Sequence, residues 1–492
     1  MSARSAVASA TSRTAERVTA RPRGVELGLL IASGVVLAVA LVALQLSLGN
    51  DLTWDVAIIV GGYILVFGLA HLVLCLKAPN ADQIMLPVAA MLNAIGLVMI
   101  YRLDLAMDMS LSNSQMMWTV IAVACFGAVM WFMKSHTTLQ NYAYLLGLGA
   151  LVLSALPIVW PTSMNADAKV WITLGPISIQ PGEFAKIMLL IFFAALLVNK
   201  RTLFSVAGKR FLGLQFPRLR DLGPILLVWG LAILIMAAQN DFGPALLLFA
   251  TILGMLYMAT GRSSWLVIGL GLAVVGVYIV FQISPKIQDR FTNFLDPIGN
   301  YDGTGYQLSQ ALFGMSFGGL TGTGLGEGYP QNVPVAWSDF ILSSIGEELG
   351  FVGLAAVLIL FAILISRGFL TALRATDSFG KLVAAGLSLT LAVQIFVVTG
   401  GISRLLPMTG LTTPFMSHGG SSLLANYILL AILLKISHDM NTPKTGGGDT
   451  APGNAGAPGT GDAPSTSLSN PVSTGNSTGT STGTSTEKEA HR

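Results

Sequence analysis

One aspartate, Asp339, stands where a Gly-rich polar loop gives way to a long apolar run, within the stretch VAWSDFILSSIGEELGFVGL. Two further acids, Glu347 and Glu348, follow about two helical turns later. Carboxylates in or beside hydrocarbon are costly, so they are functional candidates by default, and the chemistry open to them is proton transfer or cation binding. Capping of a helix is the structural alternative for Asp339. Burial against neighbouring helices is the expected role of Glu347 and Glu348.

A second group of polar residues interrupts other apolar runs. Glu183 and Lys186 are three positions apart and therefore share one helix face, with Pro181 suited to the first turn of that helix. Asp241 lies in a break, QNDFGP, between two apolar runs. A local ion pair would explain Glu183 and Lys186 equally well, and a helix cap would explain Asp241. The loop before Asp339 adds further charged residues, among them Lys286, Asp289, Arg290 and Asp296.

The composition indicates a membrane protein. The 492 residues are 53% hydrophobic and only 10% charged, whereas soluble domains carry about 25% charged residues. Apolar runs of about 20 residues recur along the chain, as in helical membrane proteins. The two cysteines, Cys75 and Cys125, lie in apolar runs and predict small core residues rather than a disulfide framework or a metal site. We find no sequence signature of nucleic-acid binding.

We expect an all-α polytopic membrane fold with about twelve transmembrane helices. The Arg-rich arm at 1–23 precedes a first span that is too long for the apolar region of a cleaved signal peptide. The tail at 439–492 is rich in Gly, Thr, Ser, Pro and Asn, and is expected to be disordered. The expected spans are 25–47, 56–76, 84–101, 116–133, 142–160, 184–199, 223–240, 244–259, 265–283, 340–366, 380–402 and 417–437.

Basic residues predict the orientation of the chain. They gather in the N-terminal arm, in the loop 200–222 and in the loop 367–379. With twelve spans these segments share one side, which the positive-inside rule makes cytoplasmic, with both termini there. The loop 284–339 then lies outside, and it is too long and Gly-rich for a simple connector. We expect a partly helical lid with glycine hinges in 303–328. The apolar residues expected to pack onto the helices are Leu308, Leu312, Phe313, Met315 and Phe317.

The acids and cations near the outer helix ends predict one cavity open to the outer leaflet. Such a cavity would suit an amphiphile whose head group is polar and whose tail stays in lipid. The segment GGLTGTGLG lacks the lysine of a nucleotide-binding P-loop and has no strand–turn–helix context, so a nucleotide site is rejected.

Five separated motifs occur in order between residues 84 and 438. They read WITLGPISIQPGEFAK, QNDFGPALLL, DGTGYQLSQALFGMSFGGLTGTGLGEG, SDFILSSIGEELGFVG and LLPMTGLTTPFMSHGGSSLLANY. Together they resemble the shape, elongation, division and sporulation (SEDS) glycosyltransferases, the RodA/FtsW family. The resemblance implies a ten-helix core at 84–438, which contains the outer loop, and two additional helices at 24–83, as in actinobacterial members. The last motif is more similar to the RodA elongation branch than to the FtsW division branch.

Three stretches depart from the family's pattern. Gly182 stands where the family commonly has Ser, and QNDFG stands at 239–243 where Gln-Pro-Asp-Leu-Gly is common. Val170 replaces the Arg of a frequent Arg-Trp pair, with Lys169 as a candidate source of the cation. The acids of the family motifs are retained.

The resemblance implies a peptidoglycan glycosyltransferase of the bacterial cytoplasmic membrane, with its active site facing outward. Its substrates would be lipid II and the growing glycan strand, and its partner a class B penicillin-binding protein. The family's essential aspartate falls on Asp339, which is the expected catalytic residue. Glu183 and Asp241 are also candidate ligands of a divalent cation, Mg²⁺ or Mn²⁺. The expected substrate-binding residues are Lys169, Glu183, Lys186, Asp241, Arg290, Gln307, Gln310, Ser417 and Ser421.

We interpret Asp339 as the general base that takes the proton of an attacking sugar hydroxyl, with a pKa raised by desolvation. Lys186, Lys169, Arg290 or a cation would balance the charge of the leaving diphosphate. A flippase for the lipid-linked precursor is one alternative, and the break at 239–244 favours it. A division-type FtsW paralogue and a non-catalytic scaffold are the others, and the outer acids count against the scaffold.

Overall fold

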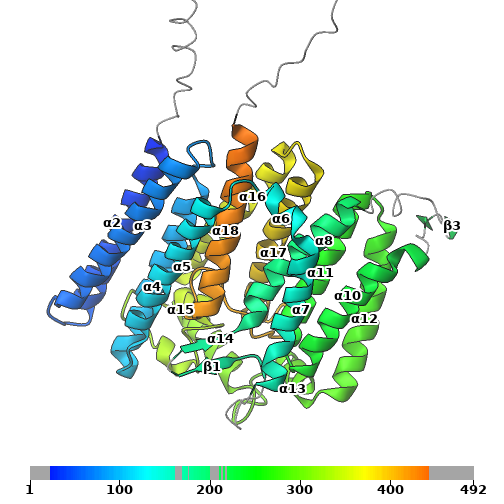
Figure 1. Cartoon of the computed structure of the whole chain (residues 1–492). Helices are drawn as coiled ribbons and strands as arrows, with labels where there is room; N and C mark the ends of the chain where they lie inside the picture. Colours follow the sequence, from blue (N-terminus) through cyan, green and yellow to red (C-terminus); the bar gives the residue numbers. More distant parts are fainter. Residues whose placement is uncertain are drawn as a thin grey trace, which may run out of the picture. The chain divides into compact units, whose positions relative to one another are not determined.

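The computed structural model describes residues 23–160, 169–175, 177–199, 210–211, 214–215 and 219–442. The N-terminal arm up to residue 22, the segment 161–168, most of the basic loop 200–218 and the tail from 443 lie outside the described residues. The described chain is a bundle of long helices (Figure 1). Its first helices are α2 Gly24–Ser47, α3 Trp54–Lys77, α4 Met85–Met107, α5 Leu111–Phe132, α6 Thr137–Asn141, α7 Ala143–Val159 and α8 Pro181–Asn199.

The second half adds further spans and the helices of the outer loop. The spans are α10 Leu219–Ala238, α11 Phe242–Thr260, α12 Ser264–Ile283, α16 Gly350–Arg374, α17 Ser378–Ile402 and α18 Gly420–Asn441. The loop helices are α13 Pro285–Leu295, α14 Tyr306–Gly318, the 3₁₀ turn η1 Pro330–Asn332 and α15 Ile341–Glu348. The strands form two short hairpins, β1 Ile172–Leu174 with β2 Ile177–Ile179, and β3 Arg210–Phe211 with β4 Leu214–Gln215.

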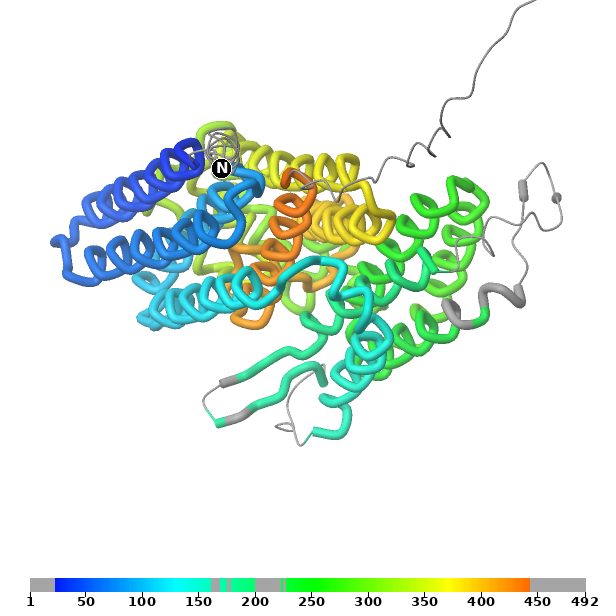
Figure 2. The backbone as a smooth tube through the Cα atoms, turned by 45° about the horizontal axis from the view of Figure 1, so that its top comes forward, coloured from blue at the N-terminus to red at the C-terminus, as the bar shows by residue number. Residues whose placement is uncertain are grey.

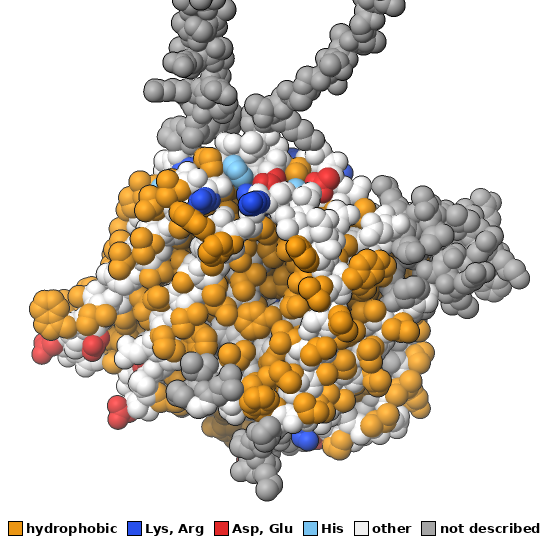
Figure 3. Space-filling view, in the orientation of Figure 1, with side chains coloured by type: hydrophobic (Ala, Val, Ile, Leu, Met, Phe, Trp, Pro, Cys, Tyr) orange, Lys and Arg blue, Asp and Glu red, His pale blue; other side chains and the backbone are white. Residues whose placement is uncertain are grey.

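Every expected span contains a helix. Within the described residues, ten helices are long and apolar enough to cross a membrane, and α7 and the apolar part of α10 are shorter. The visible face is covered by hydrophobic side chains, with charged ones toward its ends (Figure 3). The expectation of an all-α polytopic membrane protein is confirmed.

The tenth span was predicted with a wrong start. The apolar run 340–366 is divided at Leu349, where α15 ends and α16 begins at Gly350 with a φ of +67°. A positive φ is costly for residues other than glycine, so Gly350 permits a break that hydrophobicity alone does not reveal. Asp339 therefore does not open a membrane span; it precedes a separate buried helix. Glu347 and Glu348 end that helix rather than lying inside a long one.

The core of the bundle lies around four helices. In α4, α8, α17 and α18, 72 to 89% of the most apolar 18-residue stretch of the helix is buried. In α12 only 6% of the corresponding stretch is buried. α18 contacts α4, α5, α8, α16 and α17, and Figure 2 shows it among them. Helices buried this deeply form the frame of the molecule, and α12 presents almost all of its surface outward.

The hairpin β1–β2 leads the chain into α8. The strands are antiparallel, with Thr173 opposite Ser178, and Gly175 turns the chain with a φ of +65°. Pro181 then starts α8, as expected from its fixed φ and missing N–H. This arrangement sets Glu183 and Lys186 in the first two turns of α8.

The Gly-rich segment after α14 is fastened to the end of α15 by backbone contacts. The N–H groups of Thr323 and Gly324 donate to the carbonyls of Glu347 and Glu348. A Cβ atom at Gly322 would lie 2.1 Å from the carbonyl oxygen of Glu348. Gly322 is therefore needed for close packing of two backbones, and the expected hinge role of the glycines stays a prediction.

A buried ion pair completes this attachment. Arg102 Nε of α4 donates to Glu348 Oε1 at 2.8 Å, and Arg102 Nη2 donates to the carbonyl of Gly328 at 2.8 Å. The N–H of Gly326 donates to Glu348 Oε2. Glu348 is fully buried and Arg102 nearly so. The expectation that Glu348 is a structural acid facing the bundle agrees with these contacts.

The outer loop packs onto the bundle only in part. Leu308 is buried, and Leu312 and Met315 pack against the core, as predicted. Phe317 is 80% exposed and Phe313 lies at the surface, so these two aromatic residues do not pack as expected. Their side chains remain available to groups outside the described fold.

Substitution of Arg102 tests the anchoring ion pair. Arg102→Ala should lower the free energy of unfolding by about 3–5 kcal/mol, because it leaves the Glu348 carboxylate buried without its partner. Thermal or denaturant unfolding in detergent measures the change. Arg367→Ala is the matched control, since Arg367 pairs with Asp82 at 3.4 Å and is one-third exposed; it should cost at most about 1 kcal/mol. Equal effects of the two substitutions would contradict the anchoring role.

Candidate active site

Asp339 lies half-buried at the end of the outer loop, just before α15. The N-cap position of α15 is Phe340, and no side-chain cap hydrogen bond is found there. Capping therefore does not account for Asp339. Burial raises the pKa of the Asp339 carboxyl to about 6, although its own backbone N–H and the nearby Arg290 guanidinium favour the charged form.

Arg290 brings a positive charge against Asp339. It extends from α13, and its Nη1 donates to the carbonyl of Thr409 at 3.0 Å. Gly410, with a φ of +71°, lies between the two side chains: a Cβ atom there would be 3.1 Å from Arg290 Nη2 and 3.9 Å from Asp339 Oδ2. Burial lowers the pKa of Arg290, while Asp241 and Asp339 favour its charged form.

Asp241 belongs to the same charged group. Asn240 has a φ of +57°, so the chain turns sharply between α10 and α11. Asp241 occupies the N-cap position of α11, but its side chain makes no cap hydrogen bond. Burial raises the pKa of Asp241 to about 6; Glu183 raises it further, and the surrounding cations oppose the shift. These cations are Lys286, Arg290 and Lys186.

Glu183 and Lys186 form the predicted ion pair on α8. Lys186 Nζ donates to Glu183 Oε2 at 2.9 Å, and both side chains are buried. Lys186 Nζ also donates to Gln394 Oε1 of α17 at 3.3 Å, and Gln394 Nε2 donates to the carbonyl of Thr412 at 2.8 Å. The pair is thus part of a network that joins α8, α17 and the loop before α18.

The two predicted serines hold backbone segments of the site in place. Ser417 Oγ donates to the carbonyl of Ser338 and accepts from the N–H of Thr413. Ser421 Oγ accepts from the N–H of Gln180 at 2.8 Å. Ser417 therefore supports the backbone next to Asp339, and Ser421 supports the start of α8.

Three predicted binding residues are not joined to this group by any contact within the described part of the chain. Lys169 is exposed before β1. Gln307 donates to the carbonyl of Pro334, and Gln310 donates to the hydroxyl of Tyr301. The two glutamines hold the outer loop together, and substrate binding by all three stays a prediction.

Sequence reasoning did not single out Gln394, Thr409 or Gly410. Gln394 is an amide in the middle of an apolar run, and a polar residue at membrane depth is a signal that could have identified it. Thr409 contributes only its carbonyl, and Gly410 only its lack of a side chain. No pattern of side-chain types indicates such roles.

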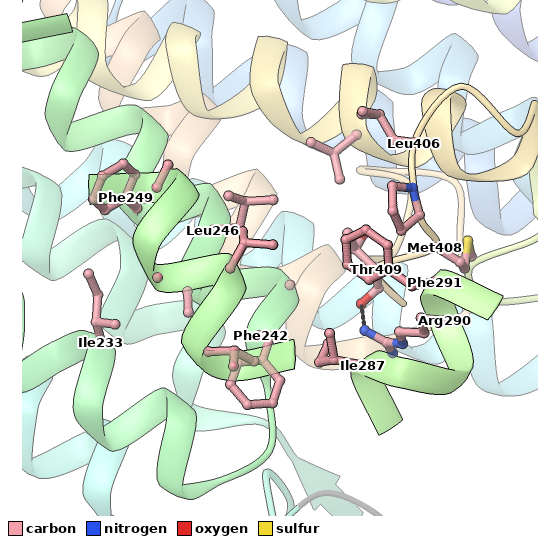
Figure 4. Close-up of a pocket in the computed structure, with 18 of the residues that line it drawn as sticks. Ile233, Phe242, Leu246, Phe249, Ile287, Arg290, Phe291, Leu406, Met408 and Thr409 are labelled. Atoms are coloured by element: carbon pink, nitrogen blue, oxygen red, sulfur yellow. Dashed lines mark hydrogen bonds between the residues drawn. The ribbon is translucent and has the colours of Figure 1, made fainter. Parts of the chain in front are cut away.

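An apolar cavity of about 400 Å³ leads away from the charged group. In Figure 4, Arg290 lies at one end of it, bonded to Thr409, while Phe242, Leu246 and Phe249 line it from α11. The other walls come from α10, α12, α13, α17 and the chain after α17. The lining is almost entirely hydrophobic, which suits a hydrocarbon ligand with its polar end at Arg290.

Glu183 and Asp241 are the two carboxylates expected to bind a divalent cation. Among the described residues, no group of three or more His, Cys, Asp or Glu side chains is arranged for a metal ion. Glu183 and Asp241 match the one or two carboxylates with which proteins hold Mg²⁺ beside substrate phosphates. A cation there would share Glu183 with Lys186.

Comparison with known proteins identifies the family. The family model for FtsW, RodA and SpoVE, described as a cell cycle protein, matches residues 82–442. The chain belongs to this family. A peptidoglycan glycosyltransferase RodA of Mycobacterium tuberculosis is 49% identical over 430 residues, 86% of this chain and 92% of the relative. A probable peptidoglycan glycosyltransferase FtsW of a Geobacter species is 32% identical, over 74% of this chain and 98% of the relative.

A solved structure supports the same assignment. One chain of a peptidoglycan synthase complex, described as coordinating polymerization and crosslinking, matches with a TM-score of 0.60 and 26% identity. The match covers 73% of this chain and 98% of that chain. The predicted resemblance to the SEDS family is confirmed, and the higher identity to RodA than to FtsW agrees with the predicted branch.

The pKa of the Asp339 carboxyl tests whether this group is buried beside Arg290. The protonated carboxyl of Asp339 should disappear with a midpoint near pH 6, as measured by infrared difference spectra between the protein and Asp339→Asn. Arg290→Met should move the midpoint upward, because the guanidinium favours the ionised carboxylate. A midpoint near pH 4, or one unaffected by Arg290→Met, would contradict a buried carboxyl beside Arg290.

Proposed function

We propose that this RodA-like protein polymerises lipid II into glycan strands at the outer face of the bacterial cytoplasmic membrane, for cell elongation. The observation that carries the proposal is the apolar cavity that ends at Arg290, next to Asp339 and Asp241. A lipid-linked diphosphate sugar has the matching order of parts: hydrocarbon, anionic diphosphate and reacting saccharide. Relatives named peptidoglycan glycosyltransferase at 49% identity support the same activity.

Asp339 acts as the general base in the proposed reaction. A hydroxyl of the acceptor sugar attacks the anomeric carbon of the donor, and Asp339 takes the hydroxyl proton as the new C–O bond forms. The bond from the anomeric carbon to the diphosphate oxygen breaks, and its electron pair leaves with the lipid diphosphate. A pKa of about 6 keeps Asp339 ionised at neutral pH and makes it a stronger base than an ordinary aspartate.

Arg290 and Lys186 supply positive charge to the leaving diphosphate. Arg290 is oriented by Thr409, and Lys186 by Glu183 and Gln394. Donors fixed before the reaction stabilise developing negative charge without reorganisation. A Mg²⁺ or Mn²⁺ ion held by Glu183 and Asp241 would neutralise the same diphosphate.

The partner and orientation are part of the proposal. The positive-inside rule favours cytoplasmic termini, which leaves Asp339 and the outer loop on the external side. A solved synthase complex that couples polymerization to crosslinking supports a class B penicillin-binding protein as partner. The 49% identity to RodA, against 32% to FtsW, favours elongation over division.

Replacement of Asp339 tests the proposed base. Purified Asp339→Asn should lose at least about 100-fold of its lipid II polymerisation rate, because the amide cannot accept the proton. Asp302→Asn, at an exposed acid of the same loop, should retain full activity. Gel analysis of labelled glycan measures both. Full activity of Asp339→Asn would exclude the base role; transbilayer movement of lipid II by the wild type without polymer would favour the flippase.

Filling the cavity tests the proposed tail site. A side chain at Gly276 meets no atom within 4 Å and would enter the cavity, so Gly276→Phe should raise the KM for full-length lipid II at least several-fold. Gly271→Phe is the control, since it lies on the same helix α12 in equally open space but does not line the cavity. A short-chain lipid II should be less affected by Gly276→Phe. Identical kinetics for the two variants would place the tail elsewhere.

A further inference from the structure

A second cavity, of about 230 Å³, lies in the outer loop between α14 and the segment that follows it. It shares no lining residue with the apolar cavity of Figure 4. Its walls carry acids, side-chain amides and aromatic rings, and none of its lining residues is a lysine or arginine. The chemistry of the tail cavity does not use it.

Glu347 is the buried acid of this cavity. The residue is only 6% exposed, and its Oε1 accepts the N–H of Tyr329 at 2.6 Å. No hydrogen bond to its Oε2 is found in the part of the chain that the structure describes, and Oε2 lies toward Gly314, where a Cβ atom would approach it to 2.5 Å. Arg102, whose charge acts on Glu347, is itself engaged by Glu348 and by loop carbonyls. A buried carboxylate therefore faces the cavity with one oxygen open.

The rim adds a second acid and two exposed rings. Glu327 is exposed and lines the same cavity. Phe317 is 80% exposed and Tyr329 66% exposed, both on the cavity wall. Carboxylates attract a cation, and aromatic faces add cation–π attraction. The combination fits a primary ammonium group better than an anion or a plain hydrocarbon.

The separation between Asp339 and Glu347 indicates which part of the substrate could carry the ammonium group. Glu347 follows Asp339 by eight residues, mostly in α15, which corresponds to roughly 12 Å of helix rise. Three residues of extended peptide span roughly 10 Å. The peptide stem of lipid II branches from the saccharide that reacts, so an ammonium group carried about three residues along that stem would lie at a matching distance from Asp339. We propose that this cavity binds the side-chain amine of the substrate's peptide stem, an inference that rests on the proposed function.

The experiment compares lipid II carrying a free stem lysine with the same lipid II after acetylation of that lysine. For the wild type, acetylation should raise KM about 10-fold with little change in kcat, because it removes the charge that the acids recognise. Glu327→Gln and Glu347→Gln should raise KM for the free amine and reduce the effect of acetylation. Glu327→Gln changes an exposed side chain, so it keeps the comparison valid should Glu347→Gln fold poorly.

Asp302→Asn is the matched control, since it removes an exposed acid of the same loop that does not line the cavity. It should retain the full effect of acetylation. Binding of both lipids to Asp339→Asn protein provides the same comparison without catalysis, so failure of the proposed reaction is distinguished from failure of amine recognition. Equal binding and KM for the two lipids, or an acetylation effect unchanged in both Gln variants, would overturn the proposal.

Discussion

The buried ion pair between Arg102 and Glu348 is the contact on which the outer half of the molecule depends. Two opposite charges removed from water are stable only when each also has further hydrogen bonds. Here the backbone of the Gly-rich segment supplies them: the carbonyl of Gly328 to Arg102, and the N–H of Gly326 to Glu348. The ion pair thereby adds to the backbone contacts that hold the loop against α4 and α15. Because Asp339 precedes α15 and Glu347 lies in its last turn, this attachment sets the depth of both acids.

The candidate active site is assembled by backbone as much as by side chains. Residues 403–419, between α17 and α18, provide a carbonyl to Arg290, a carbonyl to Gln394 and a hydroxyl that supports the residue before Asp339. α13, α17 and the residue before Asp339 are far apart in sequence but meet on this one segment, and α8 is linked to it through Gln394. Electrostatically, two carboxyls with raised pKa surround a guanidinium at the mouth of an apolar cavity. That arrangement suits a ligand that brings its own negative charge and its own hydrocarbon.

The sequence predicted the order of the spans because most of them contain an apolar run long enough to cross a bilayer. It also predicted the acids and cations of the site, because charged residues at membrane depth are conspicuous. The break at Gly350 was missed, since one glycine in an apolar run does not distinguish a continuous helix from two. The roles of Gly322 and Gly410 could not be predicted either, since they depend on which atoms of other segments lie where a side chain would be. Phe317 was expected inside because it is apolar, yet it lies on the wall of a polar cavity.

The two helices that precede the family's matched region are tied to its outer loop at one small residue. Ser47 Oγ, at the end of α2, donates to the carbonyl of Leu325, and a Cβ atom at Gly326 would come within 2.4 Å of that hydroxyl. The same Gly326 donates its N–H to Glu348. The two extra helices therefore contact the same glycine that supports Glu348. A shortened form beginning at the matched region would uncover the far side of Gly326, so the extra pair serves as an integral brace rather than a detachable anchor.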